Sequence, residues 1–131
     1  LVVGLAAYKH LQSLHNSLDD ARDMRAFLVE HGFEVMLVLD GTLAEIRQAI
    51  KGFLALLAPG VVAFVYCASH GVQIDGGMFL LPVDFNLAHD LDEAKRDAIS
   101  LEMLLEQMKR KKPLIQIAVI IACRPTSAGV R

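Results

Sequence analysis

The sequence predicts a single α/β domain in which helices cover both faces of a mostly parallel sheet. Apolar, strand-like runs alternate with segments of helical periodicity along the chain. The run Val61–Cys67 is apolar throughout, as expected for a parallel strand buried on both faces. Hydrophobic residues make up 54% of the 131 residues, which is enough for the core of one domain. Right-handed crossovers between parallel strands would place the helices on both faces.

The first strand and helix are predicted from the start of the chain. Leu1–Ala6 is apolar and β-prone, so it is expected to form the first strand. Asn16 or Ser17 can cap a helix that runs to about His31, and Gly32 is suited to end it.

A second strand and helix follow. Phe33–Leu39 has strand character and ends at an Asp-Gly pair. Thr42 and Glu45 have the spacing of a capping box, in which the Thr oxygen accepts a backbone N–H and the Glu reaches back to the cap. Apolar residues at helical spacing then continue to Pro59, where the helical segment ends.

The second half of the chain adds a hairpin, a helix and a last strand. Val72–Leu81 is expected to form a hairpin that turns at Asp75-Gly76-Gly77. Pro82–Asp97 is predicted to be a long polar connection. Ser100 can cap the next helix, and Leu114–Ile121 is expected to be the fourth core strand.

Two residues with catalytic chemistry follow two of these strands. His70 comes just after Val61–Cys67, and Cys123 just after Leu114–Ile121. The carboxyl ends of neighbouring parallel strands lie together, and α/β sheets keep their ligand crevices there. An imidazole beside a thiol is the arrangement that makes a cysteine nucleophilic. A cysteine alone at a strand end is more often a small buried apolar residue, so the prediction rests on the pair.

Three segments resemble the caspase-like cysteine peptidases, which include caspases, metacaspases and paracaspases. They are residues 16–24 (NSLDDARDM), Ser69-His70-Gly71 with residues 79–84 (FLLPVD), and Ala122-Cys123-Arg124. His70 precedes Cys123 by roughly the 50 residues expected of caspases. The resemblance implies a caspase-like fold with a small β-hairpin after the catalytic histidine strand. It corresponds to the large catalytic subunit, so residues 1–131 would form that portion of the peptidase domain without its small-subunit portion.

The resemblance also implies a role for each residue around the pair. Cys123 would attack the peptide carbonyl, and His70 would act as acid and base, chiefly protonating the leaving amine. The backbone N–H groups of Gly71 and Cys123 would form the oxyanion hole. A glycine suits this position because it allows the substrate to approach the backbone closely. No cofactor is expected, and no metal, because no Cys/His cluster has metal-ligand spacing.

Asp20 is the candidate specificity residue. In paracaspases and metacaspases an aspartate at the matching position receives substrate Arg or Lys, and a carboxylate is what bidentate Arg recognition requires. Residues 14–16 lack the arginine with which caspases hold a substrate Asp. The resemblance therefore implies an endopeptidase that cleaves after Arg or Lys. Ile121 departs from the pattern, because relatives with this specificity usually carry a second Asp two residues before the cysteine.

Two other functions stay open. The departure at Ile121 is compatible with a catalytically silent caspase-like domain that serves as an interaction or regulatory module. A flavodoxin-like or receiver-like binding module shares the coarse pattern, although residues 4–7 lack the phosphate-binding G-x-G-x-x-G motif. Among the remaining candidates, Cys67 is expected to be strand core, and Asp84 could be a simple turn residue.

Charge and hydropathy limit which partners are expected. The net charge of −2 without a basic stripe argues against nucleic acid, and no apolar run is long enough to span a membrane. Two cysteines in apolar strands give no disulfide framework, which fits a reducing compartment such as the cytoplasm. The basic run Lys109–Lys112 suits a solvated helix end.

The expected partners are a protein or peptide substrate and the small subunit of the same protein. In this family the loop beyond the nucleophile is where the two subunits are often separated by self-cleavage, which makes Arg131 a candidate autoprocessing site.

Overall fold

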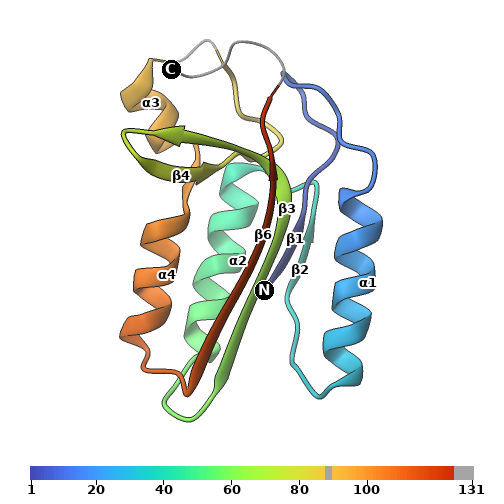
Figure 1. Cartoon of the computed structure of the whole chain (residues 1–131), viewed down its shortest axis with the longest axis vertical. Coiled ribbons are helices and arrows are strands. Elements are labelled where there is room, and N and C mark those ends of the chain that lie inside the picture. The colour runs from blue at the N-terminus through green and yellow to red at the C-terminus, as the bar shows by residue number, and fades with distance from the viewer. Residues whose placement is uncertain (88–89, 126–131) are drawn as a thin grey trace.

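Strands and helices alternate along the chain in this computed structural model, which describes residues 1–87 and 90–125 (Figure 1). In chain order the elements are β1 Val2–Gly4, α1 Ser17–Glu30, β2 Leu37–Leu39, α2 Leu43–Leu56, β3 Val62–Ile74, β4 Gly77–Leu80, α3 Leu91–Arg96, β5 Ile99–Ser100, α4 Leu101–Arg110 and β6 Ile115–Cys123. No helix in this part of the chain combines the length and the apolar character that a membrane crossing demands.

Strand β3 organises the sheet because it takes part in two patterns of pairing. Its residues Val62–His70 pair in parallel with β6, while β1 pairs in parallel with the other edge of β3 and with β2. Its last residues, Gly71–Ile74, pair antiparallel with β4, which in turn pairs with the short β5. The predicted caspase-like arrangement, a mostly parallel sheet with a small hairpin after the histidine strand, is confirmed.

The hairpin turns where its sequence signal lies. Asp75 and Gly76 both have positive φ, 51° and 82°. Two consecutive residues in this region form the turn whose twist matches that of the flanking strands, and Asp-Gly is a preferred sequence for it.

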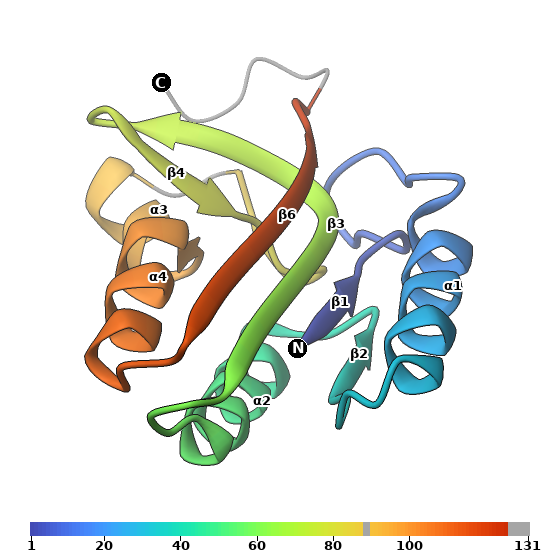
Figure 2. The same ribbon diagram turned by 60° about the horizontal axis from the view of Figure 1, so that its bottom comes forward.

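Helices cover both faces of the sheet, as predicted: α1 lies on one face, and α2 and α4 lie on the other (Figures 1 and 2). Alternate residues of β3 divide accordingly, with Val65 in the core cluster under α2 and α4 and Tyr66 in the cluster under α1. Gly4 allows α1 to approach closely, because a Cβ there would lie 2.6 Å from the Ala21 Cβ and 2.7 Å from the Ser17 carbonyl oxygen.

The predicted helix starts are mostly confirmed. The hydroxyl oxygen of Thr42 accepts the Glu45 N–H and a Glu45 carboxylate oxygen accepts the Thr42 N–H, so the capping box is present at the start of α2. The Ser100 hydroxyl accepts the Met103 N–H at 3.2 Å and caps α4. Asn16 occupies the N-cap position of α1, but its side chain makes no capping hydrogen bond.

Two strands extend further than predicted. β3 continues beyond Cys67 to Ile74, and β6 continues beyond Ile121 to Cys123. His70 and Cys123 therefore belong to strands instead of following them. The physical reason is the continuing pairing: the parallel ladder reaches the His70–Cys123 pair, after which β3 passes directly into the hairpin.

The prediction of a long polar connection over 82–97 is wrong in its second part. This stretch contains α3, which is capped by the Asp90 carboxylate accepting the Glu93 N–H at 2.8 Å. The short strand β5 follows it. One buried residue, Ala94, anchors α3, so the segment carries too little apolar periodicity for the helix to be read from the sequence.

Strand β6 lies at the edge of the sheet that the described residues form, although its apolar sequence is typical of a core strand. Within the described residues it pairs only with β3. Its side chains remain accessible, with 51% of Ile115 and 49% of Ile121 exposed. One edge of backbone N–H and C=O groups is consequently open to further pairing.

Candidate active site

His70 and Cys123 form the last pair of the parallel ladder between β3 and β6. Neighbouring strands lie about 4.8 Å apart, and paired residues of parallel strands project from the same face. By this alternation the two side chains share the α1 face of the sheet. His70 is buried, with 2% of its surface exposed, whereas Cys123 is exposed. The fold thus pairs a buried histidine with an exposed cysteine at the end of one ladder. That the two side chains act as a catalytic dyad stays a prediction.

Both ring nitrogens of His70 face backbone carbonyl oxygens. Nε2 lies 2.7 Å from the Gln12 oxygen and Nδ1 lies 3.2 Å from the Cys123 oxygen. A carbonyl oxygen only accepts hydrogen bonds, and a neutral imidazole has a single N–H to donate. A doubly protonated ring could donate to both oxygens, so these two contacts would accommodate an imidazolium.

Tyr8 holds His70 in place through its ring and its hydroxyl group. Its ring packs edge-on against the imidazole, with 4.6 Å between centroids and 61° between planes. The His70 backbone N–H donates to the Tyr8 hydroxyl at 2.9 Å, and that hydroxyl donates to the Leu81 carbonyl at 2.8 Å. Burial raises the pKa of Tyr8, so the phenol remains a neutral donor. Nothing in the sequence around Tyr8 indicates this role, so the contact with His70 was not predicted from the sequence.

Replacing Tyr8 with phenylalanine is expected to lower the free energy of unfolding by about 1–3 kcal/mol, because a buried N–H and a buried C=O lose their shared partner. Urea denaturation measures this loss. Tyr66→Phe is the matched control, because Tyr66 is also a buried residue and its hydroxyl has no hydrogen-bond partner within residues 1–87 and 90–125. Equal losses in both variants would show that the Tyr8 hydroxyl has no special part.

Gly71 has a steric reason to be glycine. A Cβ at this position would lie 2.9 Å from the Ala122 Cβ and 3.3 Å from the Met78 sulfur. The missing side chain therefore allows the end of β6 to pack against β3 beside Cys123. The contribution of the Gly71 and Cys123 N–H groups to an oxyanion hole stays a prediction.

Asp20 borders the α1 face of the sheet. It lies in the first turn of α1 and is exposed. Burial, and to a lesser degree the negative charge of Asp20, raises the pKa of Tyr66, which places the carboxylate near that ring. Ile121 pairs with Ala68, two residues before the His70–Cys123 pair, and therefore lies on the same face. Asp19 instead forms a surface ion pair with Arg22 at 3.3 Å.

The other cysteine has the properties of a core residue. Cys67 is 2% exposed and belongs to the cluster on the opposite face. Burial raises the pKa of its thiol to about 11, so it is protonated at neutral pH. Its sulfur donates to the Ser69 hydroxyl at 3.5 Å. The prediction that Cys67 is strand core is confirmed.

Two aspartates hold the loops at this end of the sheet. Asp84 accepts the Leu43 N–H at 3.0 Å and thus ties the segment after β4 to the start of α2, which gives it a tertiary contact beyond that of a simple turn residue. Asp40 accepts the N–H groups of Ala6 and Ala7 at 2.8 and 2.9 Å. This pair of bonds directs the chain after β1 toward Tyr8, and sequence reasoning missed it.

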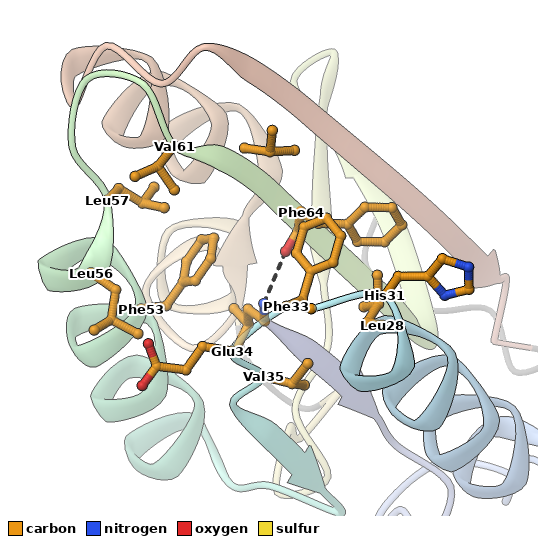
Figure 3. A pocket seen from close by; sticks show the side chains of 13 residues that line it. Leu28, His31, Phe33, Glu34, Val35, Phe53, Leu56, Leu57, Val61 and Phe64 are labelled. Atoms are coloured by element: carbon orange, nitrogen blue, oxygen red, sulfur yellow. Dashed lines mark hydrogen bonds between the residues drawn. The ribbon is translucent and has the colours of Figure 1, made fainter.

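The pocket in Figure 3 lies at the other end of the sheet. Its volume is about 390 Å³, and residues near the amino ends of the strands line it, among them Phe33, Phe53 and Phe64. It contains neither His70 nor Cys123.

Within the described residues, no three His, Cys, Asp or Glu side chains lie together in a way that could hold a metal ion. Arg131, the candidate processing site, lies outside the described residues.

Comparison with known proteins agrees with this geometry. The caspase domain family matches residues 1–131. The human mucosa-associated lymphoid tissue lymphoma translocation protein 1 is 28% identical over 124 residues, which cover 95% of this chain. Its mouse homologue is 27% identical over 124 residues. The chain spans 15% of the length of the human protein and 14% of the mouse protein. The resemblance of the sequence to caspase-like peptidases is confirmed, and the chain belongs to the caspase domain family.

Proposed function

We propose that this domain is the catalytic portion of a cysteine endopeptidase that cleaves after Arg or Lys. The observation that carries the proposal is the register of β3 and β6, which pairs His70 with Cys123. The two carbonyl oxygens around the His70 ring give further support, because they suit an imidazolium.

The reaction would proceed by acyl transfer. His70 takes the proton of the Cys123 thiol, and the thiolate sulfur forms a bond to the substrate carbonyl carbon. The N–H groups of Gly71 and Cys123 stabilise the resulting oxyanion. His70 then returns the proton to the leaving amine as the peptide bond breaks. Water, deprotonated by His70, hydrolyses the thioester and restores the free thiol.

Asp20 would supply the specificity. Its carboxylate lies on the same side of the sheet as the pair, and an Arg or Lys side chain of the substrate brings the opposite charge. Ile121 is also on this side, and it places an apolar side chain where relatives with basic specificity usually have a second carboxylate. This pocket holds less negative charge, but the charge it holds still favours a cationic substrate.

The open edge of β6 supports a partner within the same protein. Exposed apolar residues and unpaired backbone groups run together along this strand. We infer that the small-subunit portion of the same protein adds to this edge and completes the substrate cleft.

Turnover of matched peptides tests the proposal. Full-length protein is assayed with fluorogenic peptides that differ only in the residue before the scissile bond: Arg, Lys, Asp or Leu. The expected order of kcat/KM places Arg and Lys well above Leu and Asp. Cleavage after Asp would refute the basic specificity, and no cleavage of any peptide would favour a catalytically silent domain.

Replacing Ile121 with aspartate is expected to raise kcat/KM for the Arg peptide by roughly tenfold, because a second carboxylate adds a charge-assisted hydrogen bond. The residue is 49% exposed, so the new charge costs little stability. Ile121→Asn is the control of matched shape. No gain in a well-folded protein would argue that position 121 does not face the substrate. An equal gain in both variants would argue that the negative charge is not the cause.

The silent-domain alternative rests on Ile121 as well. If this apolar side chain excludes basic side chains, the domain would serve as a regulatory or interaction module. Ile121→Asp then creates activity that the natural protein lacks.

A further inference from the structure

Helices α2 and α4 lie on the face of the sheet opposite to α1 (Figures 1 and 2). Residues of both helices line a groove on this face. A hollow of about 560 Å³ has an apolar floor that includes Ile50 and Phe79. A second hollow of about 350 Å³ shares Lys51, Leu54 and Gln107 with the first, so the two form one continuous groove along the helices.

Every charged residue that lines this groove is basic, within the part of the chain that the structure describes. Among residues 1–87 and 90–125 the lining contains six cationic side chains and no Asp or Glu: Arg47, Lys51, Lys95, Arg96, Arg110 and Lys111. The chain as a whole has a net charge of −2. The concentration of positive charge is therefore a local property of the groove and does not follow from the composition.

Only part of this charge is neutralised by neighbouring acids. Lys95 pairs with Asp75 at the surface, and an Arg110 nitrogen lies 4.0 Å from Glu106. Four of the cationic residues form no ion pair within residues 1–87 and 90–125: Arg47, Lys51, Arg96 and Lys111. The cations that have no acidic partner keep the rim attractive to anions.

We propose that the groove binds an acidic amphipathic peptide segment of a partner protein. Apolar side chains of the segment enter the floor, while its Asp and Glu residues face the basic rim. Met103 stands at the groove with 64% of its surface exposed and offers an adaptable apolar contact. A concave apolar floor favours a peptide over DNA, whose contacts are made mainly to phosphates. In this proposal Arg110 and Lys111 contribute positive charge to the binding site and are more than a solvated helix end.

The proposal is independent of peptidase activity, because none of the predicted site residues lines the groove. A phage-displayed library of short random peptides, selected on immobilised full-length protein, tests it. The recovered peptides are expected to combine acidic with large apolar residues. Their affinities are then measured by fluorescence anisotropy for the natural protein and three variants.

Lys51→Glu/Lys111→Glu is expected to weaken binding at least about tenfold, since both rim charges are reversed. The control Lys9→Glu/Arg25→Glu changes the net charge equally at exposed positions away from the groove, and binding should change by less than about twofold. Met103→Ser, which keeps the charge, is expected to weaken binding by roughly threefold.

Three results would overturn the proposal. The first is recovery of no peptide whose binding depends on the groove residues. The second is equal weakening by the two charge-reversal pairs, which would indicate a general electrostatic effect. The third is groove-dependent binding of phosphatidylserine vesicles or of a short DNA duplex without peptide binding. Thermal unfolding of each variant excludes misfolding as the cause of any loss.

Discussion

Replacing Cys123 with alanine is expected to reduce kcat/KM for an Arg peptide by roughly 10⁴-fold or more, because the nucleophile and its base act as one unit. Covalent labelling by an acyloxymethyl ketone that carries Arg should disappear as well. Intact-mass spectrometry of the full-length protein measures the adduct. The substitution should leave stability nearly unchanged, since Cys123 is exposed at the end of an edge strand.

Two further variants make this result specific. His70→Ala should cost nearly as much activity as Cys123→Ala, and the double variant should be little worse than either one. Cys67→Ser is the matched control for the thiol: the Cys67 sulfur is buried and protonated at neutral pH, so its loss should leave labelling intact. Loss of labelling in Cys67→Ser with retention in Cys123→Ala would reverse the assignment of the nucleophile.

Replacing Asp20 with asparagine is expected to lower kcat/KM for the Arg peptide by roughly 10- to 100-fold, the effect of losing about 1.5–3 kcal/mol from a charge-assisted hydrogen bond. Asparagine keeps the shape of the aspartate side chain, so the variant tests the loss of charge alone. A peptide with citrulline in place of Arg supplies the complementary test. Its cleavage by the natural protein and by the variant should be similar, because citrulline has no charge for Asp20 to pair with.

Asp19→Asn is the matched control, since Asp19 lies in the same helical turn and pairs with Arg22 at the surface. It should change kcat/KM by less than about twofold. If Asp19→Asn were instead the damaging variant, the substrate pocket would lie on the other side of the helix start. If both variants cleaved Arg peptides normally, the basic specificity would need another source.

The elements that could be predicted are those with a strong local signal. The apolar run of β3, the Thr42–Glu45 capping box and the Asp-Gly turn each have one dominant physical cause, and each was found where its residues indicate. Placing His70 and Cys123 together required only the rule that parallel strands end at a common edge.

The rest depended on contacts between distant segments. Gln12 meets the His70 ring through its backbone carbonyl, which any residue could supply. Tyr8 reaches both the His70 N–H and the Leu81 carbonyl only because three separate segments converge. The number of neighbours that β6 has within the described residues could not be predicted, because apolar residues alone do not distinguish a strand with two neighbours from a strand with one.

The pairing of His70 with Cys123 has a consequence for how the domain acquires its chemistry during folding. The ladder joins segments that are 53 residues apart in sequence, and contacts across such a separation carry a large entropic cost before they become favourable. We therefore expect the thiol and the imidazole to meet late, after the local hairpin and the helices have formed. A slip of one residue in this ladder would turn Cys123 toward the face occupied by α2 and α4. Accurate alignment of these two strands during folding is therefore expected to be a condition for the reactivity proposed for Cys123.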